Sequence, residues 1–236
     1  MNKITYNTMS GMELEWRRQE TIANNLAAAN VPGFKGEFVI SSPFNQTMDE
    51  QNTLDGVSKG TIKIDYGQGE LKNTGRRLDF AIKGEGFFLV RSEDGKQMYT
   101  RNGAFTLSND MRLITDQGFS VVDENGNDVV FLPQDNVDNL EVTPEGLIRL
   151  MTGQSQDFAY RTVGKIKIQQ IDNKEDLERL TGSYYQMRDG VKPKEFKEPV
   201  PPFAVSNAML EQSNVSPIKN MTMMIQSSRD FEMSNR

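Results

Sequence analysis

The sequence predicts an α+β protein that is mainly β, with one helix near each end of the chain and an antiparallel β-domain between them. Apolar residues recur at helical spacing in residues 1–35 and again in residues 216–236. Between these ends the apolar residues alternate with a two-fold period, and turn-forming dipeptides interrupt them. We therefore expect two terminal helices to flank a sheet-rich body.

The first predicted element is a helix within residues 1–35. No proline occurs from about Lys3 to Ala29, and two apolar stripes run along this stretch at helical spacing: Ile4, Gly11, Ile22, Leu26 and Ala29, and beside them Met9, Met12, Trp16 and Ala23. A helix that is apolar on more than one side suits the wall of a tube, although a helix buried in an ordinary domain has the same pattern. Val31-Pro32-Gly33 should end the helix, because the residue before proline avoids the α region.

The middle of the chain divides into a connector and a β-domain. Residues 36–75 begin with scattered polar residues and predict an extended connector. Residues 76–188 predict the antiparallel β-domain, in which Asp94-Gly95, Asn102-Gly103 and Asn125-Gly126 supply the positive-φ residues of tight hairpins. Two later runs, Val129–Leu132 and Val163–Ile171, are further predicted strands.

A linker and a second helix complete the chain. Residues 189–215 are rich in proline and predict an extended return linker. Ser216 followed by Pro217 is a strong start signal for a helix over residues 216–236, since the hydroxyl can cap it and proline needs no amide partner there. The helical spacing is then kept by Ile218, Met221, Met224, Ile225, Ser228 and Phe231.

Composition excludes several classes of function. The 236 residues contain no cysteine and no histidine, so thiolate catalysis, disulfides and the commonest general base are all missing. The net charge of -6 and the lack of a basic stripe argue against binding to nucleic acid. No apolar stretch approaches the length of a membrane span, and the N-terminus lacks the apolar region of a cleaved signal peptide. The 36% hydrophobic content suits either apolar surface that other subunits cover or ordinary solubility.

Three motifs resemble ligand sites, and each has a simpler interpretation. Gly84-Glu85-Gly86 begins like a dinucleotide fingerprint, but Leu89 replaces the third glycine, so a bend between two strands is favoured. Residues 123–134 resemble a calcium loop, but the glycine is misplaced and Gln134 replaces the bidentate glutamate. Acidic pairs such as Asp79 and Glu85 are expected by chance among 33 carboxylates. We predict a protein that is not an enzyme, with no catalytic, cofactor-binding or metal-binding residues.

Several blocks in the correct order resemble one family, the flagellar basal-body rod and hook proteins. They are Met9–Met12, Ala23–Ala27, Pro32–Lys35, Thr74–Phe88, Tyr99–Phe105, Leu210–Pro217, Met221, Met224–Ile225 and Arg229–Met233. Within the family, the short length and the runs Tyr6–Met12 and Phe231–Met233 resemble the proximal rod type. A distal rod or hook-type subunit is the alternative, and a secreted β-rich binding module or adhesin is the alternative from another class.

The resemblance implies a non-enzymatic building block of the flagellar rod. The terminal helices would pair into a coiled-coil-like inner layer, and the polymer would transmit torque from motor to hook. The implied partners are like subunits in a helical array, the distal rod protein FlgG, the proximal rod proteins FlgB and FlgC, and the type III export apparatus that would deliver the chain without a cleaved signal peptide. We expect the assembly interface to include Ile4, Gly11, Ile22, Asn25, Leu26, Ile218, Met221, Ile225 and Phe231.

Overall fold

The computed structural model describes residues 3–40, 60–152, 159–188, 190–191 and 203–234. The chain divides into two compact units. The helical unit comprises Met1–Ala29, Lys35–Gly67 and Val215–Arg236, and the β unit comprises Asn30–Phe34 and Gln68–Asn214. The described part is mainly β, with antiparallel sheets and one helix near each end, as the sequence predicts.

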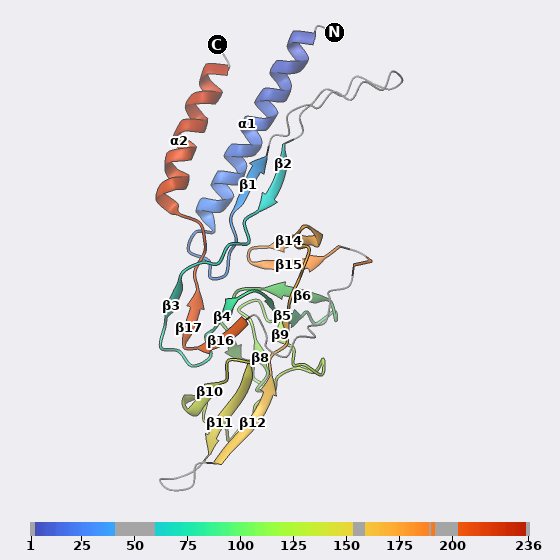
Figure 1. The fold of residues 1–236 in the computed structure, drawn as a ribbon, viewed down its shortest axis with the longest axis vertical. Coiled ribbons are helices and arrows are strands. Elements are labelled where there is room, and N and C mark those ends of the chain that lie inside the picture. The colour runs from blue at the N-terminus through green and yellow to red at the C-terminus, as the bar shows by residue number, and fades with distance from the viewer. Residues whose placement is uncertain (1–2, 41–59, 153–158, 189, 192–202, 235–236) are drawn as a thin grey trace. The chain divides into compact units, whose positions relative to one another are not determined.

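The helical unit consists of two helices and one pair of strands. Helices α1 (Lys3–Ala27) and α2 (Pro217–Ser234) lie side by side and run in opposite directions, so that the start of α1 and the end of α2 are neighbours (Figure 1). Strands β1 (Glu37–Ile40) and β2 (Thr61–Ile64) form an antiparallel pair that packs along α1. Helices α1 and α2, from opposite ends of the sequence, thus belong to the same compact unit.

The ends of both helices follow the predicted signals. Helix α1 ends at Ala27, four residues before the Val31-Pro32-Gly33 break, in which Gly33 has a positive φ of 68°. Helix α2 begins at Pro217, and the hydroxyl of Ser216 accepts the amide N–H of Lys219 at 3.5 Å. The predicted cap and the proline at the first helical position are therefore confirmed.

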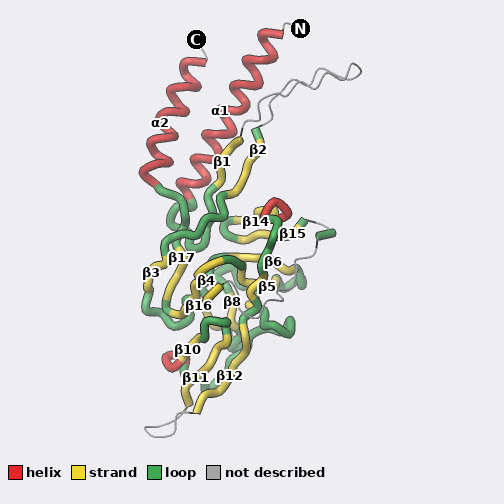
Figure 2. Tube along the Cα trace, viewed as in Figure 1, coloured by secondary structure: helices red, strands yellow, loops and turns green. Residues whose placement is uncertain are grey.

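The β unit contains the remaining strands and two short 3₁₀ helices, η1 (Val137–Asn139) and η2 (Lys174–Asp176). Short strands joined by loops run through this unit (Figure 2). The strands are β3 (Leu71–Asn73), β4 (Phe80–Gly84), β5 (Phe87–Arg91), β6 (Gln97–Thr100), β7 (Thr106–Leu107), β8 (Leu113–Ile114), β9 (Ser120–Val121), β10 (Leu140–Val142), β11 (Leu147–Thr152), β12 (Ala159–Lys165), β13 (Ile168–Gln169), β14 (Leu177–Thr181), β15 (Tyr184–Met187), β16 (Phe203–Asn207) and β17 (Met209–Glu211).

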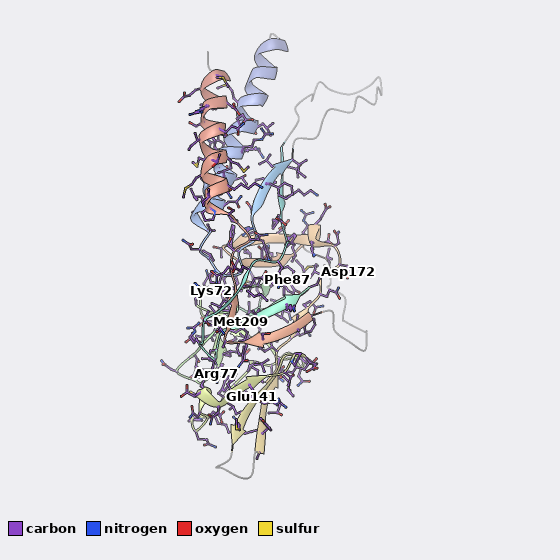
Figure 3. All side chains as sticks on the ribbon, turned by 60° about the vertical axis from the view of Figure 1, so that its left-hand side comes forward. Lys72, Arg77, Phe87, Glu141, Asp172 and Met209 are labelled. Carbon is purple, nitrogen blue, oxygen red and sulfur yellow. The ribbon has the colours of Figure 1, made fainter. Side chains whose placement is uncertain are left out.

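The largest sheet has the order β14-β15-β6-β5-β9-β8-β7, with β13 pairing to β5. A second sheet has the order β10-β11-β12. The end of the unit returns along its beginning, because β16 pairs with β4 and β17 pairs with β3. Lys72 and Met209 consequently lie on neighbouring strands (Figure 3). Strand β17, which precedes α2 in the sequence, therefore lies beside β3, the first strand of the unit.

Aromatic side chains form the centre of the β-unit core. Phe88 and Phe105 meet edge to face with ring centroids 5.3 Å apart, and Phe80 lies 5.7 Å from Phe105. Buried aliphatic side chains from three of the sheets belong to the same core, among them Ile82, Val90, Leu113, Leu140 and Ile148. The alternation in the sequence therefore reflects one continuous hydrophobic core.

The predicted glycine turns are confirmed at three places and wrong at one. Gly95 and Gly126 adopt positive φ in tight turns, and Gly84 and Gly86 form the bend between β4 and β5. Gly103 is not in a positive-φ hairpin. It is needed because a Cβ there would lie 1.8 Å from the carbonyl oxygen of Phe80.

Two predicted strands also differ from the structure. Val129–Leu132 forms no strand and contributes only an isolated bridge between Val130 and Arg112. Val163–Ile171 is divided into β12 and β13, because the chain leaves one sheet and joins another after Lys165. Periodicity alone does not show where a strand changes sheets.

The two predicted linker segments contain strands. Residues 36–75 include β1, β2 and β3, while residues 189–215 include β16 and β17. The proline-rich part of the second segment, residues 192–202, lies outside the described residues. The predicted segment boundaries at 35, 75, 188 and 215 remain predictions.

Candidate assembly surface

The buried side of α2 includes polar side chains. Ser227 is buried on this surface, where its carbonyl oxygen accepts the side-chain amide of Gln19 at 3.3 Å and its hydroxyl lies 3.4 Å from a carboxylate oxygen of Glu15. Asn220, seven residues earlier on the same face, is also buried and donates to the carbonyl oxygen of Ser216 at 2.9 Å. Hydrogen bonds as well as apolar contacts therefore hold the two helices together.

The outward surface of α2 is apolar. Ile218, Met221 and Ile225 are spaced i, i+3 and i+7, which places them on one face of the helix. Their side chains are 78%, 51% and 58% exposed. We call these three residues the α2 stripe. Large apolar residues of α2 therefore face the solvent, while Met224 and Phe231 are half-buried on the side that carries Asn220 and Ser227.

Helix α1 has both covered and uncovered faces. Ile22 is buried and Leu26 is half-buried, whereas Trp16 is exposed. The β1–β2 pair covers the face of α1 that carries Leu14, so closely that a Cβ on Gly60 would lie 2.5 Å from the Leu14 side chain. Trp16 is thus a second large apolar group left open to the solvent.

Asn25 joins α1 to β1. Its side-chain amide donates to the carbonyl oxygen of Glu37 at 2.6 Å, and its side-chain oxygen accepts the Glu37 amide N–H at 2.8 Å. This two-point contact imitates the pairing of one strand with another, and Asn25 is buried within it. An asparagine that is unfavourable in a helix interior therefore has a local structural role.

The β1–β2 pair adds more exposed apolar surface. Phe38 and Ile40 alternate with Val39, so both project from the face opposite Val39, and both are exposed. Ile62 on β2 is exposed as well. These residues are not among the predicted interface residues, although the alternation of Phe38, Val39 and Ile40 was a signal that could have identified them.

The predicted interface residues fall into distinct environments. The α2 stripe is exposed, and Phe231 is half-buried on the same helix. Ile22 and Asn25 are buried within the helical unit. Gly11 is exposed, with no atom within 4 Å of a Cβ built on it. Ile4 belongs to the first turns of α1, whose side chains are outside the described residues.

The described residues also show the surroundings of the motifs that resemble ligand sites. Among the residues that the structure describes, no three acidic side chains form a group that could hold a metal ion. Gly84, Glu85 and Gly86 form a turn between strands, and Glu85 pairs with Lys174 at 3.2 Å. No helix in the described ranges is both long and apolar enough to span a membrane.

These features define a class of protein: a β-rich chain closed by two paired terminal helices whose outward surface is apolar. Comparison with family models gives three matches that follow one another along the chain. The model for "Flagella basal body rod protein" matches residues 6–35, the model for "Flagellar hook protein FlgE/F/G D1 domain" matches residues 81–150, and the model for "Flagellar basal body rod FlgEFG protein C-terminal" matches residues 206–236.

Curated relatives match over almost the whole chain. The flagellar basal-body rod protein FlgF of Buchnera aphidicola subsp. Schizaphis graminum is 30% identical over 99% of this chain and 91% of its own length. FlgF of Salmonella typhimurium is 29% identical over 99% of this chain and 91% of its own length. FlgG of Agrobacterium fabrum is 28% identical over 96% of this chain and 90% of its own length.

The chain belongs to the flagellar basal-body rod protein family. The predicted family is therefore confirmed, and the relatives are named as rod proteins rather than enzymes.

Proposed function

We propose that this chain is a structural subunit of the bacterial flagellar basal-body rod. It polymerises through its terminal helices into the axial drive shaft that transmits torque from motor to hook. Its family membership supports a rod component, and the exposed α2 stripe supports the role of the helices.

The α2 stripe is the observation that carries the proposal. Exposed apolar surface disfavours the isolated chain by about 25 cal/mol for each Å² that remains in water. A neighbouring subunit that covers Ile218, Met221 and Ile225 removes this cost and orders the helices at the same time. Polymerisation is then driven by burial of the surface that the monomer leaves open.

The geometry of such an assembly follows from the position of the stripe. A patch that meets a different patch on the next copy makes a heterologous contact, which continues as a helical array when the rotation does not close. Terminal helices packed in this way form a coiled-coil-like inner layer, with the β-domain outside it. We assign contacts within this layer to seven of the nine predicted residues. The other two, Ile22 and Asn25, are buried within the chain and contribute by holding the helical unit in shape.

The partners follow from the same assignment. Rod-family membership implies association with other basal-body components. We assign as neighbours like subunits, the proximal rod proteins FlgB and FlgC, and the distal rod protein FlgG. The flagellar type III apparatus would export the chain without a cleaved signal peptide. The FlgF relatives favour a proximal position, while the FlgG relative at 28% identity supports a distal rod subunit as the second candidate.

Replacing one stripe residue tests this function. Ile225→Asp places a charge where a neighbour must bury it, so a strain that carries this variant should lose rod assembly and motility. The purified variant should keep the unfolding midpoint of the original chain, because Ile225 is exposed within the monomer. Gln226→Asp adds the same charge at the adjacent exposed position and should leave motility intact. Normal motility with Ile225→Asp would refute the proposed role of the stripe.

A further inference from the structure

Exposed residues of α1 and α2 carry charges of opposite sign, Glu20 on α1 and Arg229 on α2. Trp16 and Glu20 are four residues apart on α1, and both are exposed. Arg229 and Met233 are four residues apart on α2, follow Ile225 at the same interval, and are exposed too. Residues four apart lie above one another on a helix. The α1 column therefore presents Trp16 and the charge of Glu20, and the α2 column presents Ile225, the charge of Arg229 and Met233.

These two charges are available for a contact with another molecule. Glu13 pairs with Arg17, and Arg18 pairs with Glu15, but Glu20 forms no ion pair with another described residue of the chain. The same holds for Arg229 within the described ranges. An exposed acid and an exposed base beside uncovered apolar groups are complementary partners.

We propose that the α2 column of one copy packs on the α1 column of a second copy, with Arg229 against Glu20 and Met233 against Trp16. This inference rests on the proposed function and names the partner of its helical surface. The occupant is a second copy because one chain carries both halves of the contact.

The direction of the helices agrees with this pairing. In a helical array all copies point the same way along the axis, so α2 of one copy meets α1 of the next antiparallel, as the two helices do within one chain (Figure 1). In an antiparallel pair, moving four residues back along α1 corresponds to moving four residues forward along α2. Both steps cover about 6 Å at 1.5 Å per residue, so both contacts form together.

The contact has a sound chemical basis at each position. A thioether beside an indole ring is a favourable pairing, and covering both removes two exposed apolar groups. The ion pair at the rim adds selectivity and fixes the register more than it adds affinity. In the same register Ile225 lies opposite Asn24, between the small side chains of Ala23 and Ala27.

Because the chain contains no cysteine, a designed disulfide tests this contact directly. A strain expressing Glu20→Cys/Arg229→Cys in place of the original chain should yield disulfide-linked dimers and larger products from mildly oxidised basal bodies. Each single cysteine variant should yield no product larger than a dimer. The control Glu20→Cys/Gln226→Cys places the second sulfur on another side of α2. This control should therefore give no products larger than a dimer. Assembled rods without the linked products, or products that join the chain only to a different protein, would overturn the proposal.

Charge reversal provides a second test that does not depend on oxidation. Glu20→Arg or Arg229→Glu alone should lower incorporation by about tenfold, since like charges then meet in the contact. Glu20→Arg/Arg229→Glu should restore incorporation, and equal incorporation in all three strains would overturn the contact. If Ile225→Asp still blocks assembly in that case, the proposed function stands and only this pairing fails. If Ile225→Asp also assembles normally, the proposed function itself fails.

Discussion

Arg101 and Glu211 form an ion pair inside the β unit, with a guanidinium nitrogen 3.2 Å from a carboxylate oxygen and side chains that are only 6% and 0% exposed. Burial lowers the pKa of the Arg101 guanidinium, and the charge of Glu211 opposes this shift. Glu211 also accepts the amide N–H of Gly69 at 2.9 Å, and Arg101 donates to the carbonyl oxygen of Gly84 at 2.8 Å. One buried pair thus joins four segments of the chain.

Glu211→Ala should destabilise the β unit strongly. Removing the carboxylate leaves the guanidinium of Arg101 buried without its counter-charge, which costs about 3–5 kcal/mol. Urea unfolding at neutral pH measures the change. Glu178→Ala is the control, because its pair with Arg188 is exposed on both sides and such pairs contribute about 0–1 kcal/mol. Similar losses in the two variants would contradict a special role for the buried pair.

Asn25→Ala should loosen the contact between α1 and β1. The variant loses both hydrogen bonds to the Glu37 backbone, at a cost of about 1–3 kcal/mol. Hydrogen exchange should speed up in residues 37–40 and much less in the β unit. Asn24→Ala removes the exposed neighbouring asparagine and should slightly raise helix stability. Unchanged exchange in β1 of the Asn25 variant would show that the two-point contact does not stabilise the helical unit.

Tyr184 should make the β unit sensitive to alkali. Burial raises the pKa of its phenol above 10.0, and the hydroxyl donates to Asp116 at 2.7 Å. A raised folded-state pKa contributes stability that is fully present below pH about 10 and is lost as pH rises toward the folded-state value. Denaturant unfolding at several pH values should therefore show a loss of stability above pH 10.

Tyr184→Phe separates this effect from general alkaline damage. The variant should lose about 0.5–1.5 kcal/mol at neutral pH with the hydrogen bond to Asp116, and should depend less on pH above 10. Tyr160→Phe, at an exposed position, is the matched control and should keep the original pH profile. An identical profile for all three proteins would rule out Tyr184 as the sensitive group.

Ala208→Gly should stabilise the corner between β16 and β17. Ala208 has a φ of 57°, a left-handed conformation that disfavours side chains other than glycine by about 1 kcal/mol. Its carbonyl oxygen accepts the amide N–H of Thr74 at 2.9 Å, so the corner geometry is fixed by pairing. The expected gain is about 0.5–1 kcal/mol in denaturant unfolding. Ala204→Gly within β16 should instead lose stability, and the same sign in both variants would refute the strain at Ala208.

Local patterns in the sequence were enough to predict the terminal helices and several turns. Pro217 and the break at Pro32 act on neighbouring residues alone, so their effects can be read without the fold. Gly95 and Gly126 form turns whose hydrogen bonds span only a few residues. The family could also be predicted from the sequence, because the resemblance rests on short sequence motifs that follow one another in a fixed order along the chain.

Features that depend on distant contacts could not be predicted in this way. Arg101 meets Glu211 across 110 residues, and no local pattern marks either as a partner. Gly103 was assigned to a hairpin because the dipeptide Asn102-Gly103 favours turns. The structure shows instead that glycine is needed there because the backbone of Phe80 lies too close for a Cβ. The periodicity of α2 identified an apolar stripe, but only the structure shows that this stripe is exposed while Asn220 and Ser227 are buried and Ser227 contacts α1.

An electron cryo-microscopy map of the assembled rod, with side-chain density for α2, tests the central claim most directly. The account predicts that Ile218, Met221 and Ile225 each lie within about 4 Å of apolar atoms from a neighbouring subunit. A map in which all three remain open to solvent, while the β units supply every contact between subunits, would contradict it.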